Sequence, residues 1–210
     1  MASNLSFIPS QKPVVAAFDF DGTITKRDTL LSFLAFTAGK WEMAKKLAAI
    51  SPQLLGFVCG AVSRQGAKEA ILKSFFQGIP LEQLRELGTG FAQSSMLARL
   101  IHPGALKRLE WHRNQNHRCI LISASIDIYL DPWRRRLGFQ DLLCSHLEVD
   151  QNAVVTGYLQ GMNCWGPEKA RRLQDLLGSK EDYILYAYGD SRGDQELLSL
   201  ADYPFYRKMQ

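Results

Sequence analysis

The sequence lacks the features of a secreted, disulfide-linked or membrane-spanning protein. The N-terminal residues show no basic segment followed by a long apolar run, so no signal peptide is expected. The most apolar window, residues 47–62, is interrupted by Ser51 and Pro52 and is too short to span a bilayer. The four cysteines contain no Cys-x-x-Cys pair and lie far apart, at positions 59, 119, 144 and 164. This spacing predicts neither a disulfide framework nor a zinc site. We therefore expect a cytoplasmic protein without stable membrane insertion.

A strong charge imbalance is also missing. The 210 residues carry a formal net charge of +4, with 22% charged and 46% apolar residues. The basic run Arg134–Arg136 is more typical of a solvated helix face than of a nucleic-acid site, so no nucleic-acid partner is expected. The four histidines lack metal-ligand spacing and are expected at the surface or in loops. The composition predicts a globular chain with one good-sized core, or a core and a modest insertion.

The feature that stands out is an apolar run that ends in two carboxylates. Residues 14–18 read as a strand and are followed by Asp19, Phe20, Asp21, Gly22 and Thr23. Residues two apart in a strand point to the same side, and two nearby carboxylates raise each other's proton affinity or require a cation. Gly22 allows the backbone to turn sharply. Taken alone, the stretch is equally compatible with an ordinary Asp-Gly turn after a strand.

Two further apolar runs also end in polar residues. Residues 119–122 lead into Ser123, Ala124 and Ser125, and residues 183–188 lead into a second acidic pair. That pair is Asp190 and Asp194, and Lys169 stands near the start of the preceding helical pattern. Because ligands of open parallel sheets bind at the carboxyl ends of the strands, we expect these groups to converge there.

The segment between the first two strands has a different pattern. Residues 41–95 place apolar side chains at helical spacing and contain no convincing buried strand, whereas strand–helix alternation resumes at Pro103. We therefore predict an α/β fold, a three-layer Rossmann-like open parallel sheet with an inserted all-helical cap. The predicted core comprises residues 1–29 and 97–210, and the predicted cap comprises residues 30–96.

The ordered set of motifs resembles one family. Asp-x-Asp-Gly-Thr at residues 19–23, Ser123, Lys169 and Gly-Asp-Ser-x-x-Asp at residues 189–194 are similar to the four motifs of the haloacid dehalogenase-like (HAD) superfamily. The spacing between the first motif and the serine resembles subfamily IB, the phosphoserine-phosphatase-like group. Each motif is weak alone, but the ordered set is specific, and the resemblance covers residues 14–204. It implies a phosphatase that hydrolyses a small-molecule phosphomonoester.

The resemblance and the chemistry of phosphoryl transfer together suggest a role for each carboxylate. Asp19 is expected to attack phosphorus and form an aspartyl-phosphate, and Asp21 to act as general acid and then general base. Mg²⁺ is the expected cofactor, held by Asp19, the backbone carbonyl of Asp21 and Asp190. Asp194 is expected to ligate through water or to orient the lysine, and a helix N-cap is a compatible second role.

The remaining groups of the predicted site would bind the phosphate. Ser123 and the backbone N–H groups of Gly22 and Ala124 are expected to donate hydrogen bonds to its oxygens, and Lys169 to neutralise its charge. The alternatives are that Ser123 only caps a helix and that Lys169 is a surface residue. Ser125 is interpreted as structural.

Substrate choice is expected to lie in the cap. In phosphoserine phosphatases an acidic residue after the first motif and a cap arginine hold the amino acid, and the candidates here are Asp28 and Arg64. Asp28 stands where glutamate would be expected, and Gly193 stands where those enzymes carry asparagine. Both departures weaken serine phosphate as the substrate. The apolar residues 47–62 leave room for a lipid phosphate, as in phosphatidylglycerophosphatase-like members of the group.

Two other functions stay open. One is a phosphotransferase, in which an acceptor other than water takes the phosphate from Asp19. The other is a non-catalytic phosphorylatable receiver or binding module, which would need neither Asp21 beyond the nucleophile nor a helical cap. We expect a monomer or a homodimer with a small-molecule phosphomonoester substrate.

Overall fold

The computed structural model describes residues 12–207, and its centre is a sheet of five parallel strands in the order β3-β2-β1-β6-β7. The strands of this sheet are β1 (Val14–Asp19), β2 (Arg118–Ile126), β3 (Asp141–Ser145), β6 (Ile184–Gly189) and β7 (Tyr203–Tyr206). Strand β1 is central and almost wholly apolar because both of its faces are covered.

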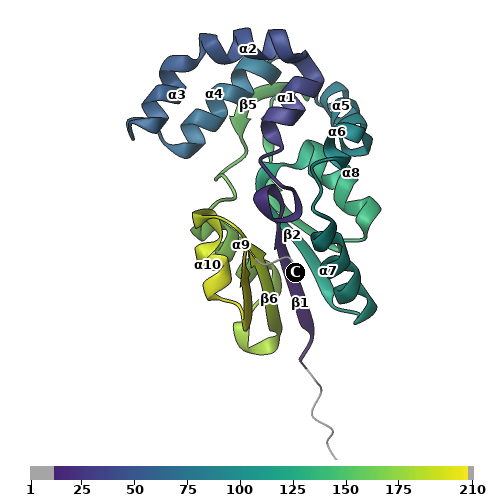
Figure 1. Cartoon of the computed structure of the whole chain (residues 1–210). Coiled ribbons are helices and arrows are strands. Elements are labelled where there is room, and N and C mark those ends of the chain that lie inside the picture. Colours follow the sequence, from purple (N-terminus) through teal and green to yellow (C-terminus); the bar gives the residue numbers. More distant parts are fainter. Residues whose placement is uncertain (1–11, 208–210) are drawn as a thin grey trace, which may run out of the picture.

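Helices cover the two faces of the sheet (Figure 1). They are α7 (Pro103–Asn114) and α8 (Asp127–Leu137) on one face and α9 (Pro167–Leu177) and α10 (Gln195–Ser199) on the other. Strand residues alternate between these layers, so Phe18 packs with the first pair of helices and Ala17 with the second. This arrangement confirms the predicted three-layer α/β fold.

The insertion after β1 is a helical cap that lies beyond the carboxyl ends of the strands (Figure 1). Its helices are α1 (Leu30–Ala38), α2 (Lys40–Ala49), α3 (Ser51–Val58), α4 (Arg64–Phe76), α5 (Leu81–Gln93) and the short α6 (Ser95–Ala98). The ring of Phe33 lies 5.5 Å from that of Phe76, 5.3 Å from that of Phe91 and 4.9 Å from that of Tyr129 in α8. The cap is therefore packed onto the core through aromatic contacts. Every helix within residues 12–207 is too short or too polar to cross a membrane.

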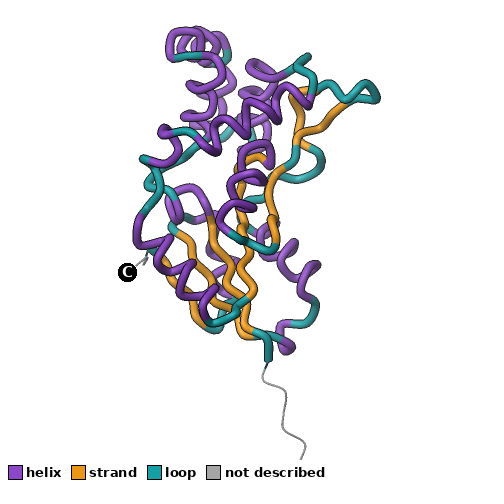
Figure 2. The backbone as a smooth tube through the Cα atoms, turned by 90° about the vertical axis from the view of Figure 1, so that its right-hand side faces the viewer, coloured by secondary structure: helices purple, strands orange, loops and turns teal. Residues whose placement is uncertain are grey.

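A small hairpin joins the cap instead of the central sheet. Strands β4 (Leu147–Val149) and β5 (Val155–Leu159) pair antiparallel, and Figure 2 shows the hairpin beside the cap helices. The N–H of Gly78 donates to the Val155 carbonyl at 2.9 Å, and the N–H of Val155 donates to the Ile79 carbonyl at 2.9 Å. The predicted boundaries place this hairpin with the core, so the structure differs there. Residues 1–11 and 208–210 of that predicted core lie outside the described residues.

One prediction about the histidines is wrong. His112 belongs to α7 and is 0% exposed. Its Nε2 lies 2.8 Å from the Tyr188 hydroxyl, and its Nδ1 lies 2.7 Å from Nδ1 of His117. The imidazole is thus a buried polar group of the core that is satisfied by hydrogen bonds.

Candidate active site

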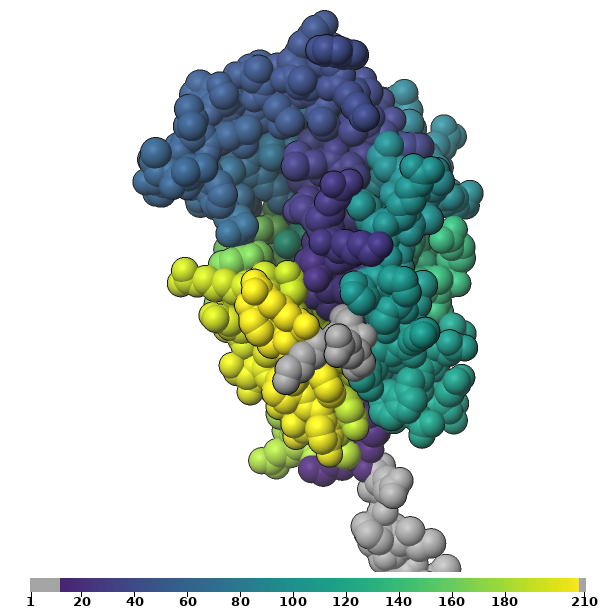
Figure 3. Space-filling view, viewed as in Figure 1, coloured from purple at the N-terminus to yellow at the C-terminus, as the bar shows by residue number. Residues whose placement is uncertain are grey.

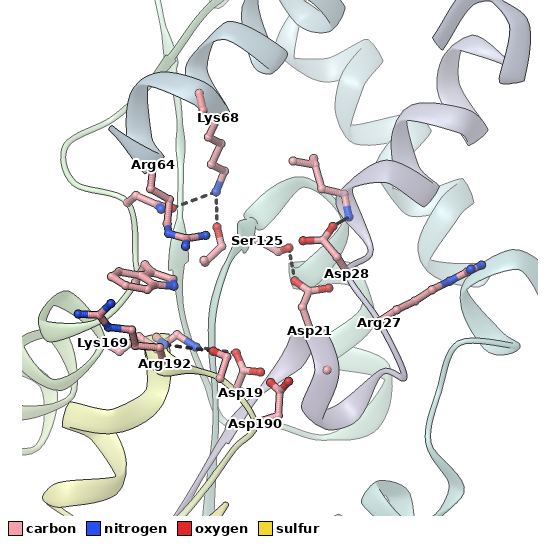
Figure 4. Close-up of a pocket in the computed structure, with 18 of the residues that line it drawn as sticks. Asp19, Asp21, Arg27, Asp28, Arg64, Lys68, Ser125, Lys169, Asp190 and Arg192 are labelled. Carbon is pink, nitrogen blue, oxygen red and sulfur yellow. Dashed lines mark hydrogen bonds and ion pairs between the residues drawn. The ribbon is translucent and has the colours of Figure 1, made fainter. Parts of the chain in front are cut away.

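The carboxyl ends of β1, β2 and β6 meet at a pocket of about 640 Å³ between the sheet and the cap (Figure 4). Most of the predicted site residues line this pocket, namely Asp19, Asp21, Gly22, Asp28, Arg64, Ala124, Lys169 and Asp190. The structure therefore brings together groups that are up to 171 positions apart in the sequence. The side chains of Ser123 and Asp194 are fully buried outside the lining of the pocket.

Lys169 is held between two carboxylates. Its Nζ lies 2.5 Å from Oδ1 of Asp19 and 2.6 Å from Oδ1 of Asp194. Burial alone would lower the pKa of Lys169, but the two carboxylates outweigh it and raise the pKa, so the side chain stays an ammonium. Burial raises the pKa of Asp19 to about 7, although Lys169 opposes the shift. Asp19 is thus a buried carboxyl group held against a fixed cation.

The second oxygen of Asp19 is available for chemistry. Oδ2 of Asp19 is buried, and among the described residues it has no hydrogen-bond partner. Carboxylate oxygens of Asp19, Asp190 and Asp194 lie within 4.8 Å of one another. Asp194 is already engaged, because its Oδ2 accepts from the Ser191 N–H at 3.0 Å and its Oδ1 from Lys169. Asp19 and Asp190 are consequently the side chains that fit a hard divalent cation such as Mg²⁺.

Gly22 is required by the close approach of Asp190. The φ angle of Gly22 is +87°, and a Cβ atom at this position would lie 2.3 Å from Oδ2 of Asp190. Glycine tolerates both conditions, whereas other residues would be strained and would displace the carboxylate. Burial, with a contribution from Asp194, raises the pKa of Asp190. The turn after β1 is thus shaped to bring two acidic strand ends together.

Asp21 is held separately from Asp19 by three hydrogen bonds. Its Oδ1 accepts from the N–H of Thr29 at 2.7 Å and from the Thr29 hydroxyl at 2.6 Å. Its Oδ2 accepts from the Ser125 hydroxyl at 2.5 Å, and Ser125 in turn accepts from the Tyr129 hydroxyl at 2.8 Å. Burial raises the pKa of Asp21 to about 6, with a further contribution from the negative charge of Asp28. A carboxyl group of this kind can exchange a proton near neutral pH.

Two predicted site residues have structural contacts. The hydroxyl of Ser123 accepts from the N–H of Ser125 at 2.9 Å, which fixes the backbone around Ala124. Asp28 lies at the exposed side of the pocket, where its Oδ1 accepts from the N–H of Leu30 at 2.8 Å and so stabilises the start of α1.

The cap contributes a cation that the sequence did not reveal. Nζ of Lys68 in α4 donates to the carbonyl of Ala124 and, at 3.1 Å, to Oδ1 of Asn163. Burial lowers the pKa of Lys68 to about 8. Its position on an amphipathic helix is typical of a surface lysine, so no sequence signal separates it from Lys73 on the same helix. Figure 4 shows Lys68 reaching toward the strand ends from the cap.

Arg64 lies at the junction between the cap and the core. Its guanidinium carbon lies 4.4 Å from the ring centre of Trp165 and 5.3 Å from that of Phe57 in α3. Trp165 in turn requires Gly193, because a Cβ atom there would lie 2.3 Å from the indole nitrogen. The glycine that replaces the expected asparagine therefore makes room for the aromatic platform under Arg64.

Comparison with known proteins identifies the family. Residues 16–199 match the haloacid dehalogenase-like hydrolase family. Protein CicA of Caulobacter vibrioides is 31% identical over 197 residues, which cover 93% of this chain and 86% of that protein. The phosphoserine phosphatase ThrH of Pseudomonas aeruginosa is 31% identical over 99 residues, 47% of this chain and 45% of ThrH.

A solved structure from Bordetella pertussis, described as having unknown function, shares the fold. Its TM-score is 0.77 at 21% identity, and the match covers 90% of this chain and 86% of that chain. The chain belongs to the haloacid dehalogenase-like hydrolase family. The resemblance to its phosphoserine-phosphatase-like group is confirmed, and so is the enzymatic class, a hydrolase of phosphoric monoesters.

Proposed function

We propose that this protein is a Mg²⁺-dependent phosphatase that hydrolyses a small-molecule phosphomonoester through an aspartyl-phosphate on Asp19. The observation that carries this proposal is the buried Oδ2 of Asp19, which has no hydrogen-bond partner within residues 12–207 and lies next to Lys169 and Asp190. Asp19, Asp190 and the backbone carbonyl of Asp21 would hold the metal. When bound, Mg²⁺ neutralises the charges that would otherwise keep the phosphate away from the nucleophile.

The side chains of the pocket divide the reaction between them. Oδ2 of Asp19 attacks phosphorus, the bond to the leaving oxygen breaks, and Asp21 gives that oxygen its proton. Asp21 then takes a proton from water, whose oxygen attacks the acyl-phosphate and releases inorganic phosphate and free Asp19. The elevated pKa of Asp21 supports both steps, because the group can be protonated in one and ionised in the next.

The remaining residues neutralise the charge of the phosphate and position the groups that bind it. Lys169 keeps its ammonium beside Asp19 throughout the reaction, and Asp194 positions the lysine through the 2.6 Å contact. The backbone N–H groups of Gly22 and Ala124 are proposed donors to the phosphate oxygens. Ser123 supports them by fixing the N–H of Ser125.

The substrate is proposed in two versions. The phosphatase names of relatives such as ThrH support an amino-acid phosphate. The cap wall of the pocket favours the second version, a lipid phosphate, because it contains the apolar residues Leu30, Leu54, Phe57, Ala67 and Ile71. A cytoplasmic location and a monomeric or homodimeric state stay predictions.

A substrate screen tests the proposal. The purified chain would be incubated with Mg²⁺ and a panel of sugar, amino-acid, nucleotide and lipid phosphates, and released phosphate would be measured. We expect release that stops in EDTA and returns with excess Mg²⁺. Full activity in chelator would refute the metal assignment, and no release from any phosphomonoester would refute the phosphatase. Analysis of products in added alcohols would show a phosphotransferase as a phosphorylated alcohol.

A further inference from the structure

The outer edge of the cap exposes three large apolar side chains. Every residue of α2 and α3 keeps part of its surface accessible, and in Figures 1 and 3 these helices form the outer edge of the cap. Trp41 is 86% exposed, Val58 79% and Leu55 63%. We call Trp41, Leu55 and Val58, together with Lys40 and Lys45, the α2–α3 ridge. Single exposed apolar residues are ordinary, but their concentration on two adjoining helices indicates an interaction surface.

Helix α3 carries apolar residues on two sides. Leu54 and Phe57, three positions apart, line the pocket, whereas Leu55 and Val58, also three positions apart, are exposed. The pocket side is explained by the site. The exposed side buries little of its surface against the rest of residues 12–207, and an eight-residue helix receives little stability from its own hydrogen bonds.

The charge of the ridge indicates the kind of partner. Residues 40–58, which span α2 and α3, contain three basic residues and one acidic residue, Glu42. Lys45 and Glu42 are 3.8 Å apart with both side chains more than half exposed, so their ion pair is weak and leaves the lysine available. Lys40 is exposed as well. Exposed apolar side chains flanked by lysines suit a surface that offers both negative charge and an apolar interior.

We propose that the α2–α3 ridge docks on the surface of a lipid bilayer that contains anionic lipids. Leu55 and Val58 enter the boundary between headgroups and acyl chains. Trp41 lies at the interfacial level that tryptophan favours, and Lys40 and Lys45 pair with anionic headgroups. Because Leu54 and Phe57 of the same helix line the pocket, α3 would lie between the bilayer and the pocket. Passage of a lipid phosphate from the bilayer past this helix is the one consequence that rests on the proposed function.

Vesicle co-sedimentation with the full chain tests the docking. The probes are vesicles of phosphatidylcholine alone and vesicles that also contain phosphatidylglycerol. We expect binding that is about tenfold stronger to the anionic vesicles and that is lost in a Leu55→Glu/Val58→Glu variant. The matched control is Leu176→Glu, an exposed leucine of α9 on the α/β part of the molecule that is 37% exposed, which should bind like the unchanged chain. Trp41 supplies a second readout, a blue shift of its fluorescence on binding that disappears in Trp41→Phe.

Each outcome decides the proposal. Circular dichroism and hydrolysis of soluble p-nitrophenyl phosphate show whether the double variant is folded. Absence of binding to both vesicle types, or binding that the double variant retains, overturns the docking. Loss of self-association in the double variant, without any vesicle binding, would instead assign the ridge to a second copy of the chain. The Asp19→Asn variant should bind vesicles like the unchanged chain, so failure of docking and failure of the phosphatase are distinguished.

Discussion

The two walls of the pocket are built in opposite ways. At the carboxyl ends of the strands, buried Asp19 and Lys169 are 2.5 Å apart, and Asp194 lies behind them, 2.6 Å from Lys169. On the cap wall, Lys68 and Arg64 contact neutral oxygens and aromatic rings, among apolar side chains. The fixed charges at the carboxyl ends of the strands suit the phosphoryl-transfer step, which is the same for every phosphomonoester. The cap cations, whose contacts here are neutral groups, suit recognition of the part of the substrate that varies.

This comparison predicts that the largest loss of activity follows a change at the carboxyl end of β1, Asp19→Asn. The amide cannot act as the nucleophile, so kcat should fall by at least about 10³-fold. The variant should keep its fold, because it removes a buried negative charge and retains an oxygen for Lys169. Phosphate release and thermal unfolding measure the two effects. Asp28→Asn, at the exposed side of the same pocket, is the control and should stay within about tenfold of the unchanged chain. Full activity of Asp19→Asn would remove Asp19 from the role of nucleophile.

Gly22→Ala tests the shape of the same wall. The added Cβ would meet Oδ2 of Asp190 at 2.3 Å, so Asp190 must move and kcat should fall by about 10²-fold. The positive φ should also lower the free energy of unfolding by about 1 kcal/mol. Gly39→Ala is the control, since Gly39 has a φ of +77° but nothing lies within 4 Å of a Cβ added there. Its ψ of 158° lies in a region that few residues besides glycine adopt, so this variant should lose at least as much stability and keep its activity. Equal kcat values for the two variants would show that the position of the Asp190 carboxylate does not affect the reaction.

On the cap wall, Lys68→Met should act mainly on KM. Methionine keeps most of the length of the side chain but removes the ammonium that reaches Ala124 and Asn163. We expect kcat/KM on the preferred substrate to fall about tenfold, chiefly through KM. Lys73→Met is the control, because Lys73 lies on the same helix with its Nζ over the ring of Tyr158, outside the pocket lining. A loss confined to kcat would instead assign Lys68 to the reaction itself.

The sequence predicted one wall of the pocket far better than the other. Asp19, Lys169 and Asp190 stand at strand ends or a helix start, in local motifs whose order identifies the family, and a parallel sheet brings such ends together. Lys68 and Trp165 become part of the site only because α4 and a distant loop meet over the strands. Their local sequence patterns are those of ordinary surface and loop residues, so their roles depend on tertiary contacts.

The buried His112 was missed for the same reason. It reads as a polar residue of an amphipathic helix, and only the approach of Tyr188 in β6 and His117 encloses it. The hairpin of β4 and β5 is attached to the cap through backbone contacts with residues 78–81, and no local sequence pattern predicts this attachment. Local periodicity predicted the elements, and long-range packing decided which layer each one joined.

His112 predicts an acid sensitivity of the core. Burial lowers its pKa to about 3, with contributions from His117 and Arg108. The unfolded chain, with an ordinary pKa near 6.5, therefore binds more protons below that pH. The free energy of unfolding should fall by about 1 kcal/mol between pH 7.5 and pH 5.8, as read from urea unfolding at each pH. His112→Gln should flatten this slope even if it lowers stability overall. An equally steep slope in the variant would assign the acid sensitivity to other groups.

The smallest effect is expected for Arg64→Ala, at the junction of the two walls. Its guanidinium lies over Trp165 and Phe57, so part of its present role is to hold the cap against the core. If it also anchors the substrate, KM should rise about threefold while kcat changes by less than about twofold. Arg85→Ala on α5, where the arginine makes an exposed 3.7 Å pair with Glu82, should leave both constants unchanged. A fall in kcat with constant KM would mean that Arg64 and the rings beneath it act on closure of the cap and not on substrate binding. The cap wall would then contribute to catalysis.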